Sequence, residues 1–509
     1  MCNEKDLLKV LEMLRKYPFL EKMLLCQLHA QKLMNFDHLD ILPNISKNIV
    51  LPWEIEAFAE LSLFSTGDMP NKSFNEQNNN DFADIITTIR NFLPPHLERL
   101  KNTPNFANSF IMAVGMLQFK CQKNILNRLY RYDYFWKYQD DNIDMPAIFA
   151  QNYQGLSYDY FIELAFAIYF FASLDANTAA SVGINNTSNI FLYICHTHSQ
   201  AIKLLSIKRD EYILRQTAKN NNDITNAVYG FNYLYPYPFI EFQGNTYLPI
   251  PYLIIDSITE SLMTRATNDN YRLREDIGKF VAQAYIKHIF KDNNVYEEVI
   301  SEIPYKKGKQ TIDSPDVMIK NHGQFCFIDS KLSTPKLSLR IFNETDITNT
   351  IQQYAKNVRQ IYNRIIDFEN KLYYPFSSSS TINKSNIFGI VVVFESSFVS
   401  QRDIYAEVFK SLGINPDSDE ARFIQSNITI TELSDIENIA FSSYNVFSAL
   451  ENKRDDSTRW HDMGLYSDTI FDSDPQKLPS LLEFEDKTKI ILTNLISDLI
   501  NKKIIPVNE

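Results

Sequence analysis

The stretch that decides the fold is SPDVMIKNHGQFCFIDSKLS, residues 314–333, in which two apolar segments flank a short polar turn. Residues 315–321 and 324–332 favour strands, because β-branched and aromatic side chains pack well on a pleated surface. Between them Gly323 can adopt the positive φ that a tight turn requires. The stretch therefore predicts a β-hairpin whose second strand, containing FCFI, is central and buried.

Charged side chains lie at the open end of this hairpin, opposite the turn. Asp316 opens the first strand, and Asp329 and Lys331 close the second. Side chains two residues apart point to the same face of a strand, so Asp329 and Lys331 face one way and Ser330 faces the other. A hairpin brings Asp316 back alongside Asp329. Two acids and one amine are therefore expected to meet, with the backbone carbonyl of Ser330 nearby.

These residue types suit the hydrolysis of a phosphodiester bond. That reaction uses a metal ion to neutralise charge on the phosphate and to activate water. Mg²⁺ prefers oxygen ligands and keeps several waters, so two or three carboxylates are enough to hold it. A lysine beside them can orient or deprotonate the attacking water, because burial and neighbouring charges tune its pKa.

Elements on either side of the hairpin extend it into a small α/β core. Two elements precede the hairpin: a helix (271–290), which contains Glu275, and a strand (295–303). A long amphipathic helix (344–374) follows the hairpin. Next come the apolar run NIFGIVVVFES (386–396), typical of a buried strand, a helix (403–414) and a last strand (423–433). The order α-β-β-β-α-β-α-β predicts a mixed sheet flanked by helices.

With these elements in place, the sequence resembles the PD-(D/E)xK nuclease superfamily, which has the restriction-endonuclease-like fold. Pro315-Asp316 matches the PD element, and Asp329-Ser330-Lys331 matches the (D/E)xK element. Glu275 stands where the family usually has an acidic residue, on the helix before the first core strand. The helix after the motif often adds a polar residue, for which Gln353, Lys356 and Gln360 are candidates. The Q-x-x-x-Y element of the RecB-like branch is missing, so no branch is assigned.

The resemblance implies a metal-dependent nuclease, and we expect an endonuclease that cuts DNA. Asp316, Asp329, Glu275 and the Ser330 carbonyl would bind Mg²⁺, with Mn²⁺ able to substitute. Lys331 would assist the water, and Gln353 would complete the catalytic set. Three alternatives stay open: Asp276 in place of Glu275, RNA in place of DNA, and a non-catalytic scaffold with a nuclease-like fold. A purely structural interpretation of the motif also stays open, in which Asp316 is a turn cap, and Asp329 and Lys331 form an exposed ion pair.

The remainder of the chain reads as mostly helical. We expect a helical region for recognition, regulation or oligomerisation at 1–225, the nuclease domain at 226–435 and a helical extension at 436–509. The first region is large enough to bind a partner protein or to form a homo-oligomer. A stand-alone nuclease joined to such a region suits bacterial defence against phage or foreign DNA, an expectation that rests on analogy with the superfamily.

Composition and charge limit the classes of protein to which the chain can belong. The 509 residues are 45% hydrophobic, which is enough for globular cores. The net charge of −12 does not by itself indicate a nucleic-acid binder, yet residues 271–375 hold 16 Lys and Arg against 13 Asp and Glu, so this segment carries +3 and the remainder −15. No apolar run approaches 18 residues, the first twenty residues lack a signal-peptide core, and the five cysteines are scattered. A cytoplasmic protein without membrane contact is expected.

Overall fold

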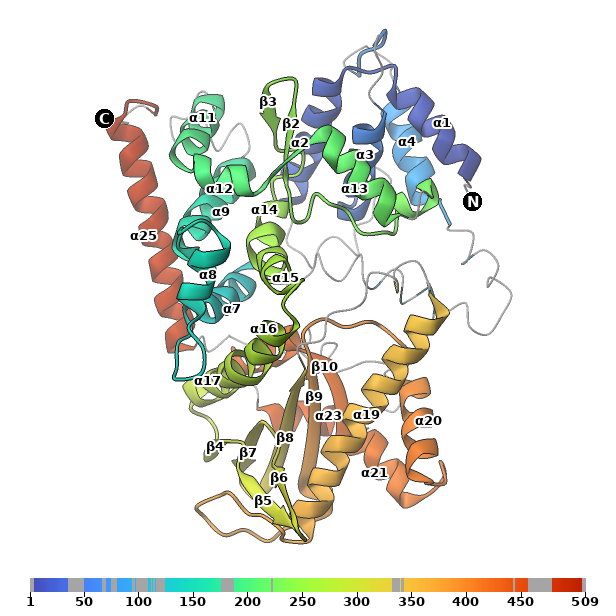
Figure 1. Ribbon diagram of the computed structural model, residues 1–509, viewed down its shortest axis with the longest axis vertical. Coiled ribbons are helices and arrows are strands. Elements are labelled where there is room, and N and C mark those ends of the chain that lie inside the picture. The colour runs from blue at the N-terminus through green and yellow to red at the C-terminus, as the bar shows by residue number, and fades with distance from the viewer. Residues whose placement is uncertain are drawn as a thin grey trace. The chain divides into compact units, whose positions relative to one another are not determined.

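The computed structural model is a mixed α+β protein whose chain forms two compact units (Figure 1). Unit 1 contains Met1–Ile125, Pro146–Asn268 and Asp486–Glu509, and unit 2 contains Leu126–Met145 and Asp269–Glu485. The residues that the structure describes are 4–34, 50–65, 70–74, 80–93, 124–174, 187–220, 223–331, 343–442, 445–455 and 478–505, with isolated residues at 97, between 109 and 115, and at 339.

Unit 1 is mostly helical, as the sequence predicts. Its described helices are α1 (Glu4–Leu14), α2 (Phe19–Met34), α3 (Pro52–Phe64), α4 (Asp81–Arg90), α8 (Met145–Asn152), α9 (Tyr158–Ser173), α11 (Thr187–Thr197), α12 (Ser199–Leu204), α13 (Arg209–Lys219), α14 (Leu253–Asp256), α15 (Leu262–Thr267) and most of α25 (Pro479–Asn501). A π-helical turn, Ser257–Ser261, joins α14 to α15. None of the helices in the described part of the chain is long and apolar enough to cross a membrane.

A small sheet completes unit 1. The strands β1 (Ser206–Lys208), β2 (Phe239–Phe242) and β3 (Asn245–Tyr247) pair in the order β1-β2-β3. The β2–β3 turn is formed by Gln243 and Gly244, both with positive φ, which suits the right-handed twist of a hairpin. This hairpin lies within the range 226–435 that the sequence assigns to the nuclease domain, but the structure places it in unit 1.

Unit 2 is built on a five-stranded mixed sheet with the order β10-β9-β8-β7-β4. Parallel pairs join β10 to β9 and β9 to β8, whereas β7 runs antiparallel to both β8 and β4. The bounds of the strands are β4 (Glu298–Ser301), β7 (Val317–Asn321), β8 (Gln324–Lys331), β9 (Ile387–Val393) and β10 (Ile428–Glu432). The sheet therefore contains all five strands that the sequence predicts, and β8 lies at its centre.

Helices cover both faces of this sheet. One face packs against α19 (Glu344–Glu369), α20 (Gln401–Leu412) and α21 (Asp419–Asn427) in a shared apolar core, and α19 runs along the strands in Figure 1. On the other side, α17 (Gln283–Asn293) contacts β4 and β7, and α22 (Leu433–Ala440) contacts β9 and β10. In α23 (Val446–Asp455), the ring of Phe447 lies 6.3 Å from that of Phe388 in β9.

Two elements of unit 2 differ from the sequence prediction. A second hairpin, β5 (Pro304–Lys307) and β6 (Gln310–Asp313), follows β4 and precedes β7 along the chain. Its strands are short and mostly polar, so the alternation of apolar side chains that marks a half-buried strand is weak there. The predicted strand at 423–433 is shorter than expected, because its first residues continue α21 and only 428–432 join the sheet.

The division into units also differs from the predicted boundaries at 225 and 435. A segment from the middle of the helical region, which contains α7 (Ile125–Lys137), packs into unit 2. Arg131 on α7 and Glu437 on α22 form a bidentate ion pair in which each side chain is only 1% exposed. Tyr285 on α17 donates a further hydrogen bond to the same carboxylate at 2.7 Å. Because ion pairing is not visible in hydrophobic periodicity, the sequence gives no sign of this connection.

Candidate active site

The β7–β8 hairpin places the two acids of the motif next to each other, as predicted. Its register pairs Val317 with Ile328, which sets Asp316 opposite Asp329 at the end of the hairpin. The turn at the other end consists of His322 and Gly323, with φ of 47° and 78°. Positive φ at both positions belongs to the tight turns that fix hairpin register. The turn that the sequence predicts therefore sets the register that brings Asp316 and Asp329 together, although they are 13 positions apart in the chain.

Asp316 is held by Ser330, the middle residue of the D-x-K element. Its Oδ2 accepts hydrogen bonds from the Ser330 backbone N–H at 2.6 Å and from the Ser330 hydroxyl at 2.8 Å. Burial raises the pKa of Asp316 to about 7, and the adjacent charge of Asp329 adds to the rise, whereas Lys331 and the Ser330 bonds oppose it. A carboxyl group that titrates near neutral pH is typical of functional sites.

Asp329 is more deeply buried, with only 2% of its surface exposed. The Lys331 ammonium lies 3.6 Å from its Oδ2, and the Lys331 side chain is 25% exposed. Within the described part of the chain, that same Oδ2 has no hydrogen-bond partner. A buried carboxylate oxygen without a hydrogen bond is costly, so most such atoms have a partner in native proteins. A cation bound at this position would remove the cost.

A third acid, Glu302, joins this group although the sequence did not single it out. Glu302 follows β4, and the β4–β7 register pairs Ser301 with Val317, which sets Glu302 opposite Asp316. Its backbone N–H donates to the Asp316 carbonyl at 3.0 Å. Burial raises the pKa of Glu302, and the charges of Asp313 and Asp329 raise it further. Only the register of β4 against β7 identifies Glu302, and the sequence does not fix that register.

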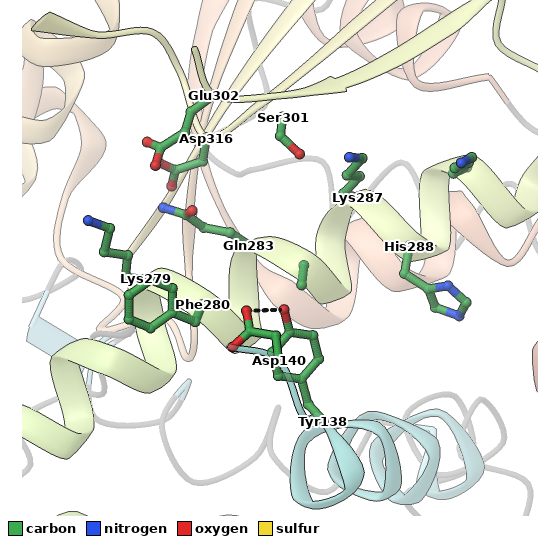
Figure 2. A pocket seen from close by; sticks show the side chains of 12 residues that line it. Tyr138, Asp140, Lys279, Phe280, Gln283, Lys287, His288, Ser301, Glu302 and Asp316 are labelled. Carbon is green, nitrogen blue, oxygen red and sulfur yellow. Dashed lines mark hydrogen bonds between the residues drawn. The ribbon is translucent and has the colours of Figure 1, made fainter. Parts of the chain in front are cut away.

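Two of these acids, Glu302 and Asp316, line a pocket of about 370 Å³. In Figure 2 these two carboxyl groups lie side by side, and the amide of Gln283 points toward them. Lys279, from the same helical segment, also lines the pocket. Positive charge from Lys279 and Lys331 lowers the pKa of Glu302 and so offsets part of the repulsion among the acids.

Glu275, in contrast, is exposed and does not line the pocket. It lies on α16 (Tyr271–Asp276), where its carboxylate raises the pKa of Tyr271 by accepting a hydrogen bond. A π-helical turn, Ile277–Ala282, separates α16 from α17. A π turn contains more residues than an α turn, so it shifts which side chains share a face. The structure therefore does not bring Glu275 to the pocket lining, where Lys279 and Gln283 lie instead.

Gln353 is also outside the pocket lining. It lies on α19, is exposed, and donates a hydrogen bond to Asn357 Oδ1 at 3.2 Å. Its predicted catalytic role has no support from these contacts. Ser330 lies next to the acids, where its N–H and hydroxyl donate to Asp316, and the role of its carbonyl as a metal ligand stays a prediction.

The donor set is consistent with a small, hard cation such as Mg²⁺. Among the residues that the structure describes, no group of three or more His, Cys, Asp or Glu side chains is placed so that it could hold a metal ion. Mg²⁺ does not need such a cage, because one or two carboxylates, several waters and the substrate phosphate commonly complete its shell. The orphaned oxygen of Asp329 and the adjacent Asp316 carboxyl are the donors that suit it here.

Comparisons with protein-family models, with curated proteins and with solved structures find no match for this chain. The chemistry of the site must therefore be judged from its own residues.

Proposed function

We propose that unit 2 is a metal-dependent nuclease of the PD-(D/E)xK kind that hydrolyses phosphodiester bonds in DNA. The observation that carries the proposal is the buried Asp329 oxygen, which has no hydrogen bond from any residue that the structure describes, while the Lys331 ammonium and the Asp316 carboxyl lie beside it. An isolated buried charge would destabilise the fold. A bound cation would neutralise the buried charge of Asp329 and so remove this cost.

Each residue of the site has a role that its surroundings favour. Asp316 and Asp329 would hold Mg²⁺ or Mn²⁺, and Glu302 would orient water within the same shell. The bound ion would supply charge neutralisation at the phosphate and a more acidic water. Lys331 is partly exposed and lies next to Asp329, so its ammonium is free to donate a hydrogen bond to the attacking water or to a phosphate oxygen. Ser330 would keep the Asp316 carboxyl in place.

The order of elements in unit 2 supports this proposal. A helix, three antiparallel strands, a crossover helix and a parallel strand place the D-x-K element at the end of the central strand β8. This order is what the resemblance to the restriction-endonuclease-like fold predicts. Unit 1 would then serve recognition of a partner protein or homo-oligomerisation, and a cytoplasmic role in bacterial defence remains part of the proposal.

Cleavage assays test the proposal directly. The purified full chain is incubated with supercoiled plasmid, linear DNA or RNA, with Mg²⁺ or Mn²⁺ or with EDTA. We expect cleavage of DNA that requires the metal, and cleavage of RNA alone would indicate the ribonuclease alternative. Lys331→Ala should lower the rate by about 10²–10⁴-fold, the range for a general acid or base, without unfolding the chain.

A matched control is Lys410→Ala, which removes a lysine of unit 2 whose side chain is 78% exposed. This variant should cleave like the wild type. Activity that persists in both Lys331→Ala and Asp329→Asn would contradict the proposal. The absence of cleavage and of metal binding in the wild-type chain would favour the scaffold alternative.

A further inference from the structure

One face of the helix that borders the pocket carries a row of lysines. Lys279, Lys287 and Lys291 all line the pocket, together with Gln283. Positions 283, 287 and 291 are four residues apart, so they share one face of α17. The Lys279 ammonium lies 5.5 Å from the centre of the Phe280 ring. Across the described ranges, none of the three ammonium groups forms an ion pair with a carboxylate.

These lysines share the pocket lining with three acids, Asp140, Glu302 and Asp316. The whole protein carries a net charge of −12, yet these three cations extend along one wall of the pocket that contains Glu302 and Asp316. At 1.5 Å per residue, the twelve steps along the helix from Lys279 to Lys291 span roughly 18 Å.

An aromatic side chain forms another part of the wall. Tyr138, which follows α7, lines the same pocket and is half-buried. Its hydroxyl donates to Asp140 Oδ2 at 3.0 Å, which fixes the ring, as Figure 2 shows. Tyrosine rings of this kind stack with unpaired bases, and cationic grooves with such rings are typical of proteins that bind single strands.

The geometry points to this face as the binding surface for the backbone of an unpaired nucleic-acid strand, with phosphates on Lys279, Lys287 and Lys291 and a base against Tyr138. The inference rests on the proposed function and names its substrate as a single-stranded region or end. A pocket of about 370 Å³ lies near the lower end of the usual range for ligand sites. The face of a paired base is covered by its neighbours in a duplex, so Tyr138 reaches only an unstacked one.

A binding measurement without catalysis tests this inference. Fluorescence anisotropy of labelled single-stranded and blunt duplex oligonucleotides is recorded with the full chain, in EDTA and in Ca²⁺, over a series of salt concentrations. The variant Lys287→Gln/Lys291→Gln leaves the acids and Lys331 intact. For the single strand, the slope of log K against log salt should become shallower by about 1.4, since each lost phosphate contact contributes about 0.7.

Tyr138 is tested by two substitutions. Tyr138→Leu should weaken single-strand binding about 5- to 150-fold, the effect of losing one stacked base, and should leave the salt slope unchanged. Tyr138→Phe keeps the ring and should restore the affinity. Equal loss in both variants would show that the hydroxyl bond to Asp140, and not stacking, is responsible, and would overturn the base contact.

The control Lys306→Gln/Lys410→Gln removes two lysines of unit 2 that do not line the pocket, and it should bind like the wild type. An unchanged slope in Lys287→Gln/Lys291→Gln, or tighter binding of the blunt duplex than of the single strand, would overturn the inference. Metal-dependent cleavage in the same preparations would then still support the proposed function. Loss of cleavage with intact single-strand binding would contradict the function and leave the binding surface standing.

Discussion

Asp316 accepts two hydrogen bonds from Ser330, one from its backbone N–H and one from its hydroxyl. This contact joins the last residue before β7 to the end of β8 and keeps the Asp316 carboxyl beside Asp329. It also keeps two acids close together although their charges repel. The cost appears as the raised pKa of Asp316, which burial and the charge of Asp329 shift to about 7.

The first prediction concerns metal binding and pH. In the proposed site a divalent cation would bind the ionised Asp316 carboxylate and would therefore compete with its proton. Below a pKa of about 7, the affinity for Mn²⁺ or Mg²⁺ should fall roughly tenfold per pH unit, and above pH 8 it should level off. Isothermal titration calorimetry at pH 6, 7 and 8 measures this change. Affinity that is constant over this range would contradict the assignment, and Asp316→Asn should remove the dependence.

The same pKa predicts how stability depends on pH without metal. The folded-state pKa of Asp316 lies above the ordinary value of 3.8, so protonation favours the folded state. This contribution is fully present below about pH 4 and is lost as pH rises to about 7 and above. Asp316→Asn should therefore raise the melting temperature of the metal-free protein at pH 8 more than at pH 4. An equal effect at both pH values would show that Asp316 has an ordinary pKa.

A third prediction separates the two effects of Asp329. With metal at a hundred times its Kd, the wild-type protein should gain about 2.7 kcal/mol, which corresponds to a rise of roughly 5–10 °C in the melting transition of unit 2. Asp329→Asn should lose this gain together with cleavage, and in EDTA it should melt no lower than the wild type, because a buried amide costs less than a buried charge. A low melting temperature in EDTA would indicate a purely structural role.

The fourth prediction compares the acid that the structure identifies with the one that the sequence favours. Glu302→Gln should lower cleavage about 10- to 100-fold, the usual cost of losing a group that orients ligands around a metal. Glu275→Gln, on the exposed surface of α16, should change the rate less than about twofold, as surface substitutions usually do. Rates are measured on one DNA substrate at saturating Mg²⁺. The reverse order of effects would restore Glu275 to the site.

The fifth prediction concerns the Arg131–Glu437 pair in the core of unit 2. Arg131→Met leaves the Glu437 carboxylate buried without its cation, which should lower the free energy of unfolding by about 3–5 kcal/mol. Urea denaturation monitored by circular dichroism measures the loss. The double variant Arg131→Met/Glu437→Leu removes both charges and should recover most of the stability. No recovery would mean that packing, and not the unpaired charge, causes the loss.

Much of the sheet and half of the site are predictable from the sequence. The hairpin of Asp316 and Asp329 follows from two apolar segments and a glycine turn, because strand periodicity and turn chemistry are local properties. The identity of β9 follows in the same way from an uninterrupted apolar run. These features depend on residues close together in the chain, so the sequence displays them directly.

The rest of the site depends on relationships that hydrophobic patterns do not encode. Glu302 reaches Asp316 through the register of two strands separated by an extra hairpin. Glu275 turns away beyond a π-helical turn, a rare element with no clear sequence signature. Gln353 lies on α19, the helix that follows the motif as predicted, but it is outside the pocket lining. A shift of one position in strand register, or of one turn in a helix, is enough to change which acid lies beside Asp316.

The interrupted course of unit 2 along the chain has a practical consequence. A fragment cut at the predicted boundaries, residues 226–435, would contain every acid of the motif but neither α7 nor Glu437. It would expose the apolar surface that α7 covers, and it would lose the pocket wall at Tyr138. Expression of that fragment should give insoluble or inactive material, and a gene truncation that spares the motif should still abolish function.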